Sequence, residues 1–194
     1  MKKRVLGIAG MLFAMGAAGF SGMSEARAAA GAYLPTSFEI VYQPVYSMAT
    51  GGPSAQLGAG GGGLRLGFQM APMIGFELGG FLDPYAFGGV PGLGGGATYA
   101  ARATAGFALA PHPGLRLTLG SDCNWFFNPP AAFTATGEKD FGIVAGARVL
   151  IGGLARFFVG AEYRYPLAAV FTYNGSGVKN TAVLGTIGMH FGGF

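Results

Sequence analysis

From about residue 37 onwards, hydrophobic and polar residues alternate with a period of two along most of the chain. Between Phe157 and Tyr165, for example, the odd-numbered positions are apolar or aromatic, whereas Glu162 and Arg164 occupy even-numbered ones. Successive side chains of a β-strand point to opposite faces, so this pattern predicts strands with one apolar and one polar face. The pattern recurs in eight segments: Ser37–Tyr46, Gly58–Met70, Ile74–Leu82, Thr98–Leu109, Leu115–Phe127, Asp140–Leu150, Phe157–Tyr165 and Thr181–Phe191.

Every charged residue within these segments falls on the parity that also carries glycine and threonine. The set contains five acids and five arginines: Glu39, Arg65, Glu77, Arg102, Arg116, Asp122, Asp140, Arg148, Glu162 and Arg164. A soluble β-sandwich or lipocalin also alternates, but it must turn a polar face to water. Only 10% of this chain is charged, against roughly 25% in globular domains. Because charge is too scarce to coat eight strands, we expect the apolar parity to face lipid and the charges to face a lumen.

The sequence therefore predicts an all-β fold, an eight-stranded antiparallel transmembrane up-and-down β-barrel. Closure of the sheet provides a partner for every backbone donor and acceptor within lipid. Helical spans are disfavoured, because proline and glycine clusters interrupt the long uncharged stretches such as Pro84–Ala101 before they reach about 18 apolar residues. The chain holds 38 glycines, and many of them share the parity of the charges, where a narrow lumen has little room.

The connectors between the segments alternate between long and short. The long ones are Ser47–Leu57, Asp83–Ala97, Asn128–Lys139 and Pro166–Asn180, and the short ones are Ala71–Met73, Ala110–Gly114 and Ile151–Arg156. Outer-membrane barrels have short periplasmic turns and longer extracellular loops, so this order predicts that both termini are periplasmic. A barrel of ten strands is the alternative, and it would require further pairing inside Asp83–Ala97 or Pro166–Asn180.

Aromatic residues gather near both ends of the predicted strands, as in the two girdles of a membrane barrel. On the periplasmic side they are Phe68, Phe76, Phe107 and Phe157, and on the outer side Tyr46, Phe81, Tyr99, Trp125, Phe141 and Tyr165.

Residues 1–30 have the features of a cleaved secretory signal peptide. Lys2, Lys3 and Arg4 precede the charge-free apolar stretch Val5–Phe20, and small residues then provide two candidate cleavage sites. A retained membrane anchor is the alternative, although the stretch is short for a span. Removal of this leader takes away four basic residues and one acidic residue, which leaves eight basic and seven acidic ones and a net charge of +1. No basic patch for nucleic acid then remains.

A leader, eight alternating segments, connectors of alternating length and a terminal Phe194 together resemble the small eight-stranded outer-membrane β-barrel family, of the kind seen in the OmpA membrane domain and OmpX. The resemblance covers residues 31–194 and implies a monomer in the bacterial outer membrane, surrounded by outer-membrane lipid and lipopolysaccharide. In that family, the barrel-assembly machinery recognises an aromatic residue at the end of the last strand. Here Phe191 is in phase with the apolar parity, whereas Phe194 follows Gly192 and Gly193 out of phase, so either phenylalanine can be the signal.

The ten lumen charges have two interpretations. The interior of an eight-stranded barrel is just wide enough for side chains to fill it, and buried charges must be paired and hydrogen-bonded. A salt-bridge network that plugs the barrel is therefore the favoured interpretation. A rearranging gate or a narrow ion path is the alternative.

Candidate catalytic and cofactor-binding residues are scarce. The only histidines are His112, in a predicted turn, and His190, on the inward parity, and neither has a serine two or three residues away. A lipid-modifying enzyme would then need Asp83, Asp122 or Glu138 as its base. Two histidines and Cys123, scattered along the chain, do not form a zinc site. The glycine run from 58 to 63 matches a dinucleotide motif formally, but a strand pattern follows it instead of a helix. We expect no metal, no cofactor and no catalysis.

The predicted outer loops are unusually apolar, and their aromatic residues include Tyr85, Phe87, Phe133, Phe171 and Tyr173. Exposed apolar clusters can mark interaction surfaces. Alternatively, these residues pack on one another or lie at the lipid headgroup level. Together with the plugged lumen, they favour a structural or surface-interaction role without catalysis. A narrow gated pore is the first alternative, and a lipid-modifying outer-membrane enzyme is the second.

Overall fold

The structure is a computed structural model that describes residues 36–43, 45–50, 61–86, 97–127, 134–135, 139–153, 155–169, 171–173 and 175–193. The strands are β1 (Ser37–Gln43), β2 (Val45–Thr50), β3 (Gly61–Ala71), β4 (Ile74–Ala86), β5 (Ala97–His112), β6 (Leu115–Phe127), β7 (Thr134–Ala135), β8 (Lys139–Gly152), β9 (Ala155–Pro166), β10 (Phe171–Tyr173) and β11 (Ser176–Gly192). No helix that is long and apolar enough to cross a membrane occurs within these ranges. The predicted signal peptide, residues 1–30, lies outside them.

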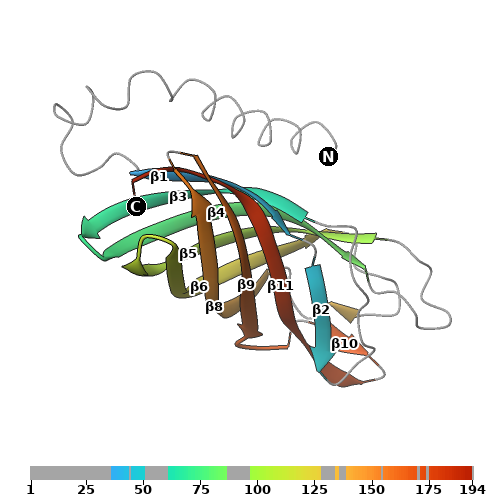
Figure 1. Cartoon of the computed structure of the whole chain (residues 1–194). Helices are drawn as coiled ribbons and strands as arrows, with labels where there is room; N and C mark the ends of the chain where they lie inside the picture. Colours follow the sequence, from blue (N-terminus) through green and yellow to red (C-terminus); the bar gives the residue numbers. More distant parts are fainter. Residues whose placement is uncertain are drawn as a thin grey trace. The chain divides into compact units, whose positions relative to one another are not determined.

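Eight strands form a closed antiparallel barrel within the described part of the chain (Figure 1). They follow one another in the order β1, β3, β4, β5, β6, β8, β9 and β11, and β11 pairs back onto β1, with Glu39 opposite His190. β2 continues from β1 and pairs with the first half of β11. Closure leaves the barrel strands without a free edge, as lipid requires. The predicted fold class is confirmed.

The two ends of the barrel differ. At one end, here called the turn end, the tight turns Pro72–Met73 and Pro113–Gly114 join neighbouring strands. The described chain also begins and finishes there, since the amide of Gly193 donates to the carbonyl of Thr36 at 3.1 Å. The opposite end, here called the loop end, carries the longer connections. This arrangement agrees with the predicted alternation of connector lengths.

Several strands extend further towards the loop end than the alternation predicts. β6 has the predicted bounds, but β4 runs on to Ala86 and β11 begins at Ser176. Hydropathy alternates only where the two faces of a strand meet different surroundings, whereas backbone pairing continues for as long as a neighbour is present. β10 pairs with the start of β11, Phe171 lying opposite Val178, and also with β7. Pairing therefore does occur inside the predicted loop Pro166–Asn180, but outside the circuit of the barrel.

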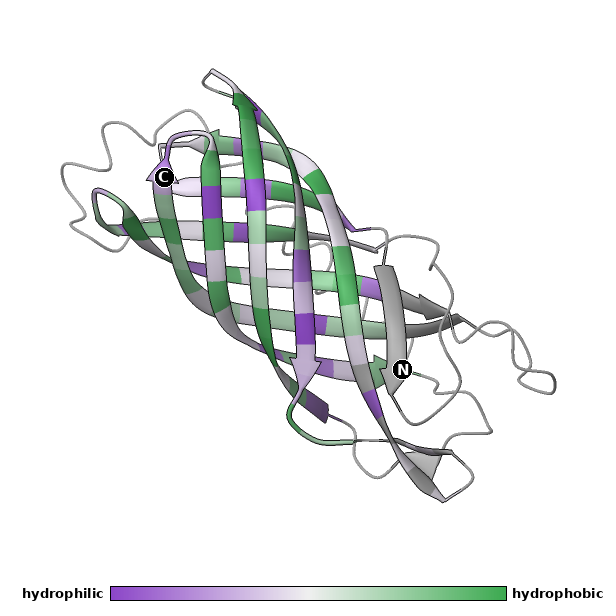
Figure 2. Cartoon of the chain, turned by 60° about the horizontal axis from the view of Figure 1, so that its bottom comes forward, coloured by the Kyte–Doolittle hydropathy of each residue, from purple (hydrophilic) through white to green (hydrophobic). Residues whose placement is uncertain are grey.

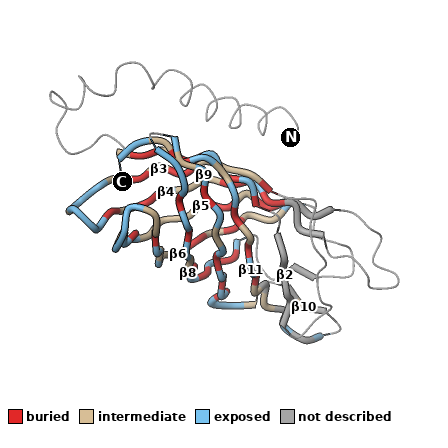
Figure 3. Tube along the Cα trace, viewed as in Figure 1, coloured by how far each residue is buried: buried red, intermediate tan, exposed pale blue. Residues whose placement is uncertain are grey.

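Most charged residues of the described strands lie inside the barrel, and many large apolar residues are exposed on its outside, the inverse of a soluble protein. Along β8, Asp140, Val144 and Arg148 are buried, whereas Phe141 and Val149 are exposed. Figure 2 shows hydrophilic and hydrophobic residues following one another along the strands, and Figure 3 shows the matching succession of buried and exposed positions.

The prediction that Phe81 belongs to the outer aromatic girdle was wrong. It shares the inward parity of Glu77 and is only 5% exposed, in a cluster with Val41 and Phe158 inside the barrel. The neighbouring inward position on the same strand requires glycine, since a Cβ at Gly79 would lie 2.6 Å from Phe81 Cε2. Parity along the strand decided the position of this ring, although the ring lies near a strand end.

Candidate functional site in the lumen

All ten charged residues predicted for the lumen are buried there. None is more than 6% exposed: Glu39, Arg65, Glu77, Arg102, Arg116, Asp122, Asp140, Arg148, Glu162 and Arg164. Asp83, Gln43 and His190 are buried beside them. We call these thirteen side chains the lumen network.

The centre of the lumen network consists of two glutamates and three arginines. Glu39 Oε2 accepts hydrogen bonds from Nη1 of Arg65 and Nη1 of Arg148, both at 2.8 Å. Nη2 of Arg148 lies 2.7 Å from both carboxylate oxygens of Glu77. Nη1 of Arg116 lies 3.3 Å from Glu77 Oε1 and 3.7 Å from Glu39 Oε1. Each carboxylate is thus shared among arginines, which compensates its removal from water.

Glu162 connects this centre to a second group nearer the loop end. It forms an ion pair with Arg65 and lies 3.7 Å from Nη1 of Arg102. Arg102 donates from Nε to Asp83 Oδ2 at 2.9 Å and from Nη2 to Gln43 Oε1 at 2.5 Å. Its guanidinium also lies 4.4 Å from the centroid of the Phe81 ring. The chain of contacts crosses the lumen from β3 to β9 and on to β5 and β4.

A third group gathers around Arg164 and contains two carboxylates for one arginine. Nε of Arg164 donates to Asp122 Oδ2 at 2.6 Å, and Nη1 lies 2.8 Å from Asp140 Oδ2. Strands β6, β8 and β9 supply these side chains, and Gly142 on β8 leaves room for them. A Cβ at Gly142 would lie 2.7 Å from Asp122 Oδ1.

His190 joins the lumen network at the seam where the first and last barrel strands close. Its Nδ1 lies 3.0 Å from Glu39 Oε1, and the ring is fully buried. The inward position of His190 was predicted from parity, whereas its contact depends on the β1–β11 register that places it opposite Glu39. The other histidine, His112, is exposed and accepts a hydrogen bond at Nδ1 from the Gly114 amide at 3.0 Å.

Asp83 and Gln43 were missed by the sequence analysis. Asp83 was assigned to a loop, although it continues the inward parity of Glu77 and Phe81, a signal that extension of the segment would have revealed. Gln43 lies on the parity of Glu39, but it carries no charge and therefore was not among the predicted lumen charges.

One small cavity borders the lumen network in the described part of the barrel. A cavity of about 30 Å³ lies beside Arg65, Glu77 and Glu162, where Gly106 and Gly120 form the wall. A water molecule needs roughly 10–15 Å³ of such space, whereas small-molecule pockets measure roughly 300–1,000 Å³. Within the described residues, no group of three or more His, Cys, Asp or Glu side chains is placed to hold a metal ion.

Comparison with known proteins identifies the fold. No family model matches the chain, and no curated protein matches its sequence. Among solved structures, Neisserial surface protein A aligns with a TM-score of 0.50 at 14% identity, over 80% of this chain and 97% of that one. The chain has the fold of small outer-membrane β-barrels. The outer membrane protein AlkL agrees, with a TM-score of 0.51 at 11% identity, over 82% of this chain and 90% of that one.

The other predicted site residues of this outer-membrane-type barrel are only partly described. Phe191 lies in β11, and its ring stacks on Phe38 with 6.4 Å between centroids. β11 ends at Gly192, whose φ of 105° favours glycine, and Phe194 lies outside the described residues. Of the predicted loop aromatics, Tyr85 falls in β4 and Phe171 and Tyr173 fall in β10, but their side chains lie outside the described part, as do Phe87 and Phe133 entirely.

Proposed function

We propose that this protein is a non-enzymatic component of the bacterial outer membrane whose lumen is closed and whose role is structural or exercised at the surface. The observation that carries the proposal is the lumen network, in which five arginines and six carboxylates span the interior and none is more than 6% exposed. An open channel would hydrate these groups and leave them free to move.

The ion pairs hold the network in place. Loss of one partner from a buried pair costs about 3–5 kcal/mol, because the other charge is left uncompensated. Arg65 and Arg148 each contact two or more carboxylates, so rearrangement of either arginine would break several contacts at once. The network therefore favours a plug over a gate.

The proposal includes the orientation of the barrel in the membrane and the lipid that surrounds it. The turn end faces the periplasm together with both ends of the barrel domain, residues 31–194, after cleavage of residues 1–30. Exposed apolar side chains such as Phe107, Leu119 and Phe141 face lipid. The protein is a monomer, and the assembly machinery recognises Phe191 or Phe194. The surface protein and the outer membrane protein that share the fold are consistent with this location.

Planar bilayers test the plug directly. We expect the refolded wild type to show no steady conductance. The double variant Arg65→Ala/Glu162→Ala removes two network side chains that line the cavity, and it should conduct, while Phe141→Ala on the outer face should remain silent. Steady conductance in the wild type that Arg164→Ala or Glu162→Ala alters would establish the gated pore instead. A shift in apparent size on SDS gels before and after boiling checks that each variant is folded.

Mass spectra of lipid A test the absence of catalysis. Overexpression of the wild type should leave the lipid A spectrum of the host unchanged. A new acylation or deacylation product that disappears in Asp83→Asn or Asp122→Asn would establish an enzyme.

A further inference from the structure

One part of the lumen wall is apolar although the lumen network fills much of the interior. Four buried apolar side chains form a single cluster there: Val41, Phe81, Leu150 and Phe158. Strand pairing places them in one row, in which each residue lies opposite the next across neighbouring strands. In order from β8 through β9, β11, β1 and β3 to β4, the row is Leu150, Phe158, Gly188, Val41, Gly63 and Phe81. We call this row the apolar band.

The apolar band runs obliquely along the barrel. Leu150 lies two residues before Gly152, where β8 ends at the turn end, whereas Phe81 lies in the half of β4 that leads to the loop end. The strands of a barrel are tilted against its axis, so a row perpendicular to the strands also advances along the axis. The band therefore lines one side of the lumen between its two ends.

Each aromatic ring of the apolar band lies against a glycine of the neighbouring strand. A Cβ at Gly188 would lie 2.8 Å from Cζ of Phe158, and a Cβ at Gly63 would collide with Cδ1 of Phe81. The two rings thus occupy the space that a side chain on β11 or β3 would otherwise take. Glycine at these two positions is required by the close approach of the rings.

The Phe81 ring also connects the apolar band with the lumen network. The guanidinium of Arg102 lies 4.4 Å from the ring centroid, and that of Arg65 lies 5.4 Å from it. Arg65 belongs to the centre of the network and Arg102 to the second group, so the ring stands where the two groups meet. Guanidinium groups are weakly hydrated and lie readily on aromatic faces. The ring therefore covers both arginines on a side that their carboxylate partners leave open.

We propose that Phe81 is the residue that closes the lumen to water, and that the ion pairs of Arg65 and Arg102 hold its ring in position. The inference rests on the proposed closed lumen and names the side chain on which closure depends. Water competes with ion pairs for charged groups, whereas it withdraws from an apolar constriction. Loss of the ring would leave a space bordered by two guanidinium groups, and polar space of this kind fills with water.

Hydrogen exchange of arginine Nε–H groups, followed by NMR on the full chain refolded in lipid nanodiscs, tests the proposal. Nε of Arg102 donates to Asp83 and Nε of Arg164 donates to Asp122, so both hydrogens should be protected in the wild type. Phe81→Ala should abolish the protection at Arg102. Arg164 belongs to the third group and should keep its protection in the same spectrum. Phe81→Leu, which preserves apolar bulk, should behave like the wild type.

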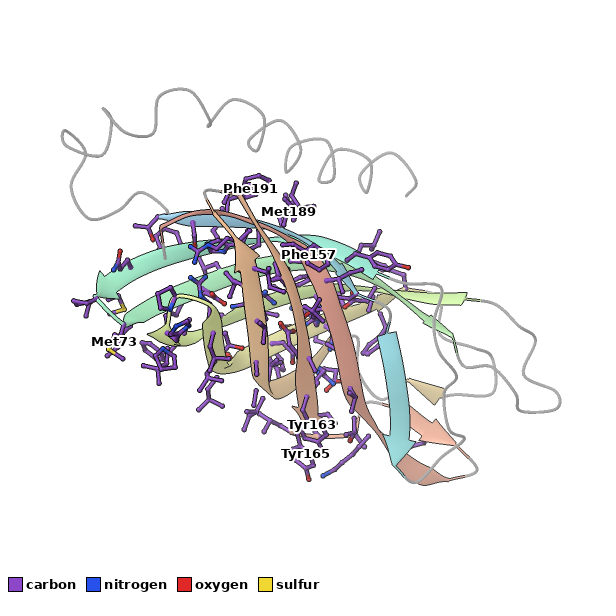
Figure 4. All side chains as sticks on the ribbon, in the orientation of Figure 1. Met73, Phe157, Tyr163, Tyr165, Met189 and Phe191 are labelled. Atoms are coloured by element: carbon purple, nitrogen blue, oxygen red, sulfur yellow. The ribbon has the colours of Figure 1, made fainter. Side chains whose placement is uncertain are left out.

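Two further phenylalanines of β9 provide matched controls. Phe158→Ala makes the same truncation inside the lumen, but the space that it leaves is bordered by Leu150 and Gly188, and apolar cavities stay dry. Phe157 is 44% exposed and pairs with Met189, and Figure 4 shows both on the outside of the barrel. Arg102 should remain protected in Phe158→Ala and in Phe157→Ala.

Undiminished protection of Arg102 in Phe81→Ala would overturn the proposal. Equal loss of protection at Arg164, or in Phe158→Ala, would also overturn it, because the ring would then contribute only to general packing. The gel shift shows whether each variant is folded, and Phe81→Val, which should lose part of the protection, replaces the alanine variant if that one does not fold. A silent wild-type barrel in which Phe81 proves dispensable leaves the proposed function intact, whereas a conducting wild type refutes that function whatever the exchange result.

Discussion

The two faces of the barrel wall consist of alternate residues of the same strands, yet they are stabilised in different ways. On β8, Arg148 points inward and binds Glu39 and Glu77, whereas its neighbour Val149 points outward and is 51% exposed. The inner side chain depends on particular partners from distant strands. The outer side chain depends only on being apolar, since any lipid chain can cover it. The effect of a substitution therefore depends on whether its position on the strand points inward or outward.

The largest difference between the faces is expected at Arg148. Arg148→Ala leaves Glu39 and Glu77 short of a partner in the buried lumen, and we expect the free energy of unfolding to fall by about 3–5 kcal/mol. The matched outward change, Val149→Ala, removes two methyl groups from a lipid-facing surface and should cost about 1–2 kcal/mol. Urea unfolding in lipid vesicles measures both. Equal losses at the two positions would remove the distinction between the faces.

The cost of placing a charge on the outer face depends on how deep in the membrane the charge lies. Ser121 lies on the outward parity at the centre of β6 and is exposed, so Ser121→Arg places a charge in the middle of the membrane. We expect a loss of about 2–4 kcal/mol. Met70, next to the turn end on β3, is the control, because Met70→Arg reaches the interface and should cost at most about 1 kcal/mol. The same vesicle unfolding assay compares them, and a reversed order would contradict the proposed placement in the membrane.

Parity made the positions of the charged residues predictable from the sequence. A two-residue period survives small errors in strand length, so Glu39, Arg148 and the other eight charges were placed in the lumen before any register was known. The inward position of Asp83 was not predicted, because Pro84 and the glycines beyond it suggested a loop. The outward position predicted for Phe81 was wrong, because its place near a strand end was given more weight than its parity.

The partners of those charges could not be predicted. Arg148 binds Glu77, 71 residues away, and Glu39, 109 residues away. These pairs meet because eight strands close with a particular stagger, and no local pattern in the sequence encodes that stagger. The contact of His190 with Glu39 has the same origin. The pairing of β10 with β11 falls in the predicted loop Pro166–Asn180, where pairing was considered only for a ten-stranded barrel, because it lies beyond the part of the strand in which hydropathy alternates.

Two adjacent glycines on β4 compare the faces with the smallest chemical change. A Cβ at Gly79, on the inward parity, would lie 2.5 Å from Thr104 Oγ1 and 2.6 Å from Phe81 Cε2, whereas a Cβ at Gly80 would meet nothing within 4 Å. Gly79→Ala should therefore cost about 1–3 kcal/mol through overpacking. Gly80→Ala should be neutral or stabilise by up to about 1 kcal/mol, since alanine restricts the unfolded chain. Vesicle unfolding of the two variants measures the difference, and a larger loss at Gly80 would show that the packing is assigned to the wrong face.

The smallest effect is expected where a polar contact lies on the outer face. Tyr165→Phe removes the hydroxyl that accepts from Lys179 Nζ but keeps the ring beneath the ammonium group. Because both side chains are accessible, the lost hydrogen bond should cost less than about 1 kcal/mol. Tyr163→Phe, two residues away on the same face of β9, is the matched control in the same unfolding assay. A loss at Tyr165 as large as that of Arg148→Ala would mean that the outer face also depends on particular partners, and the contrast between the two faces would then fail.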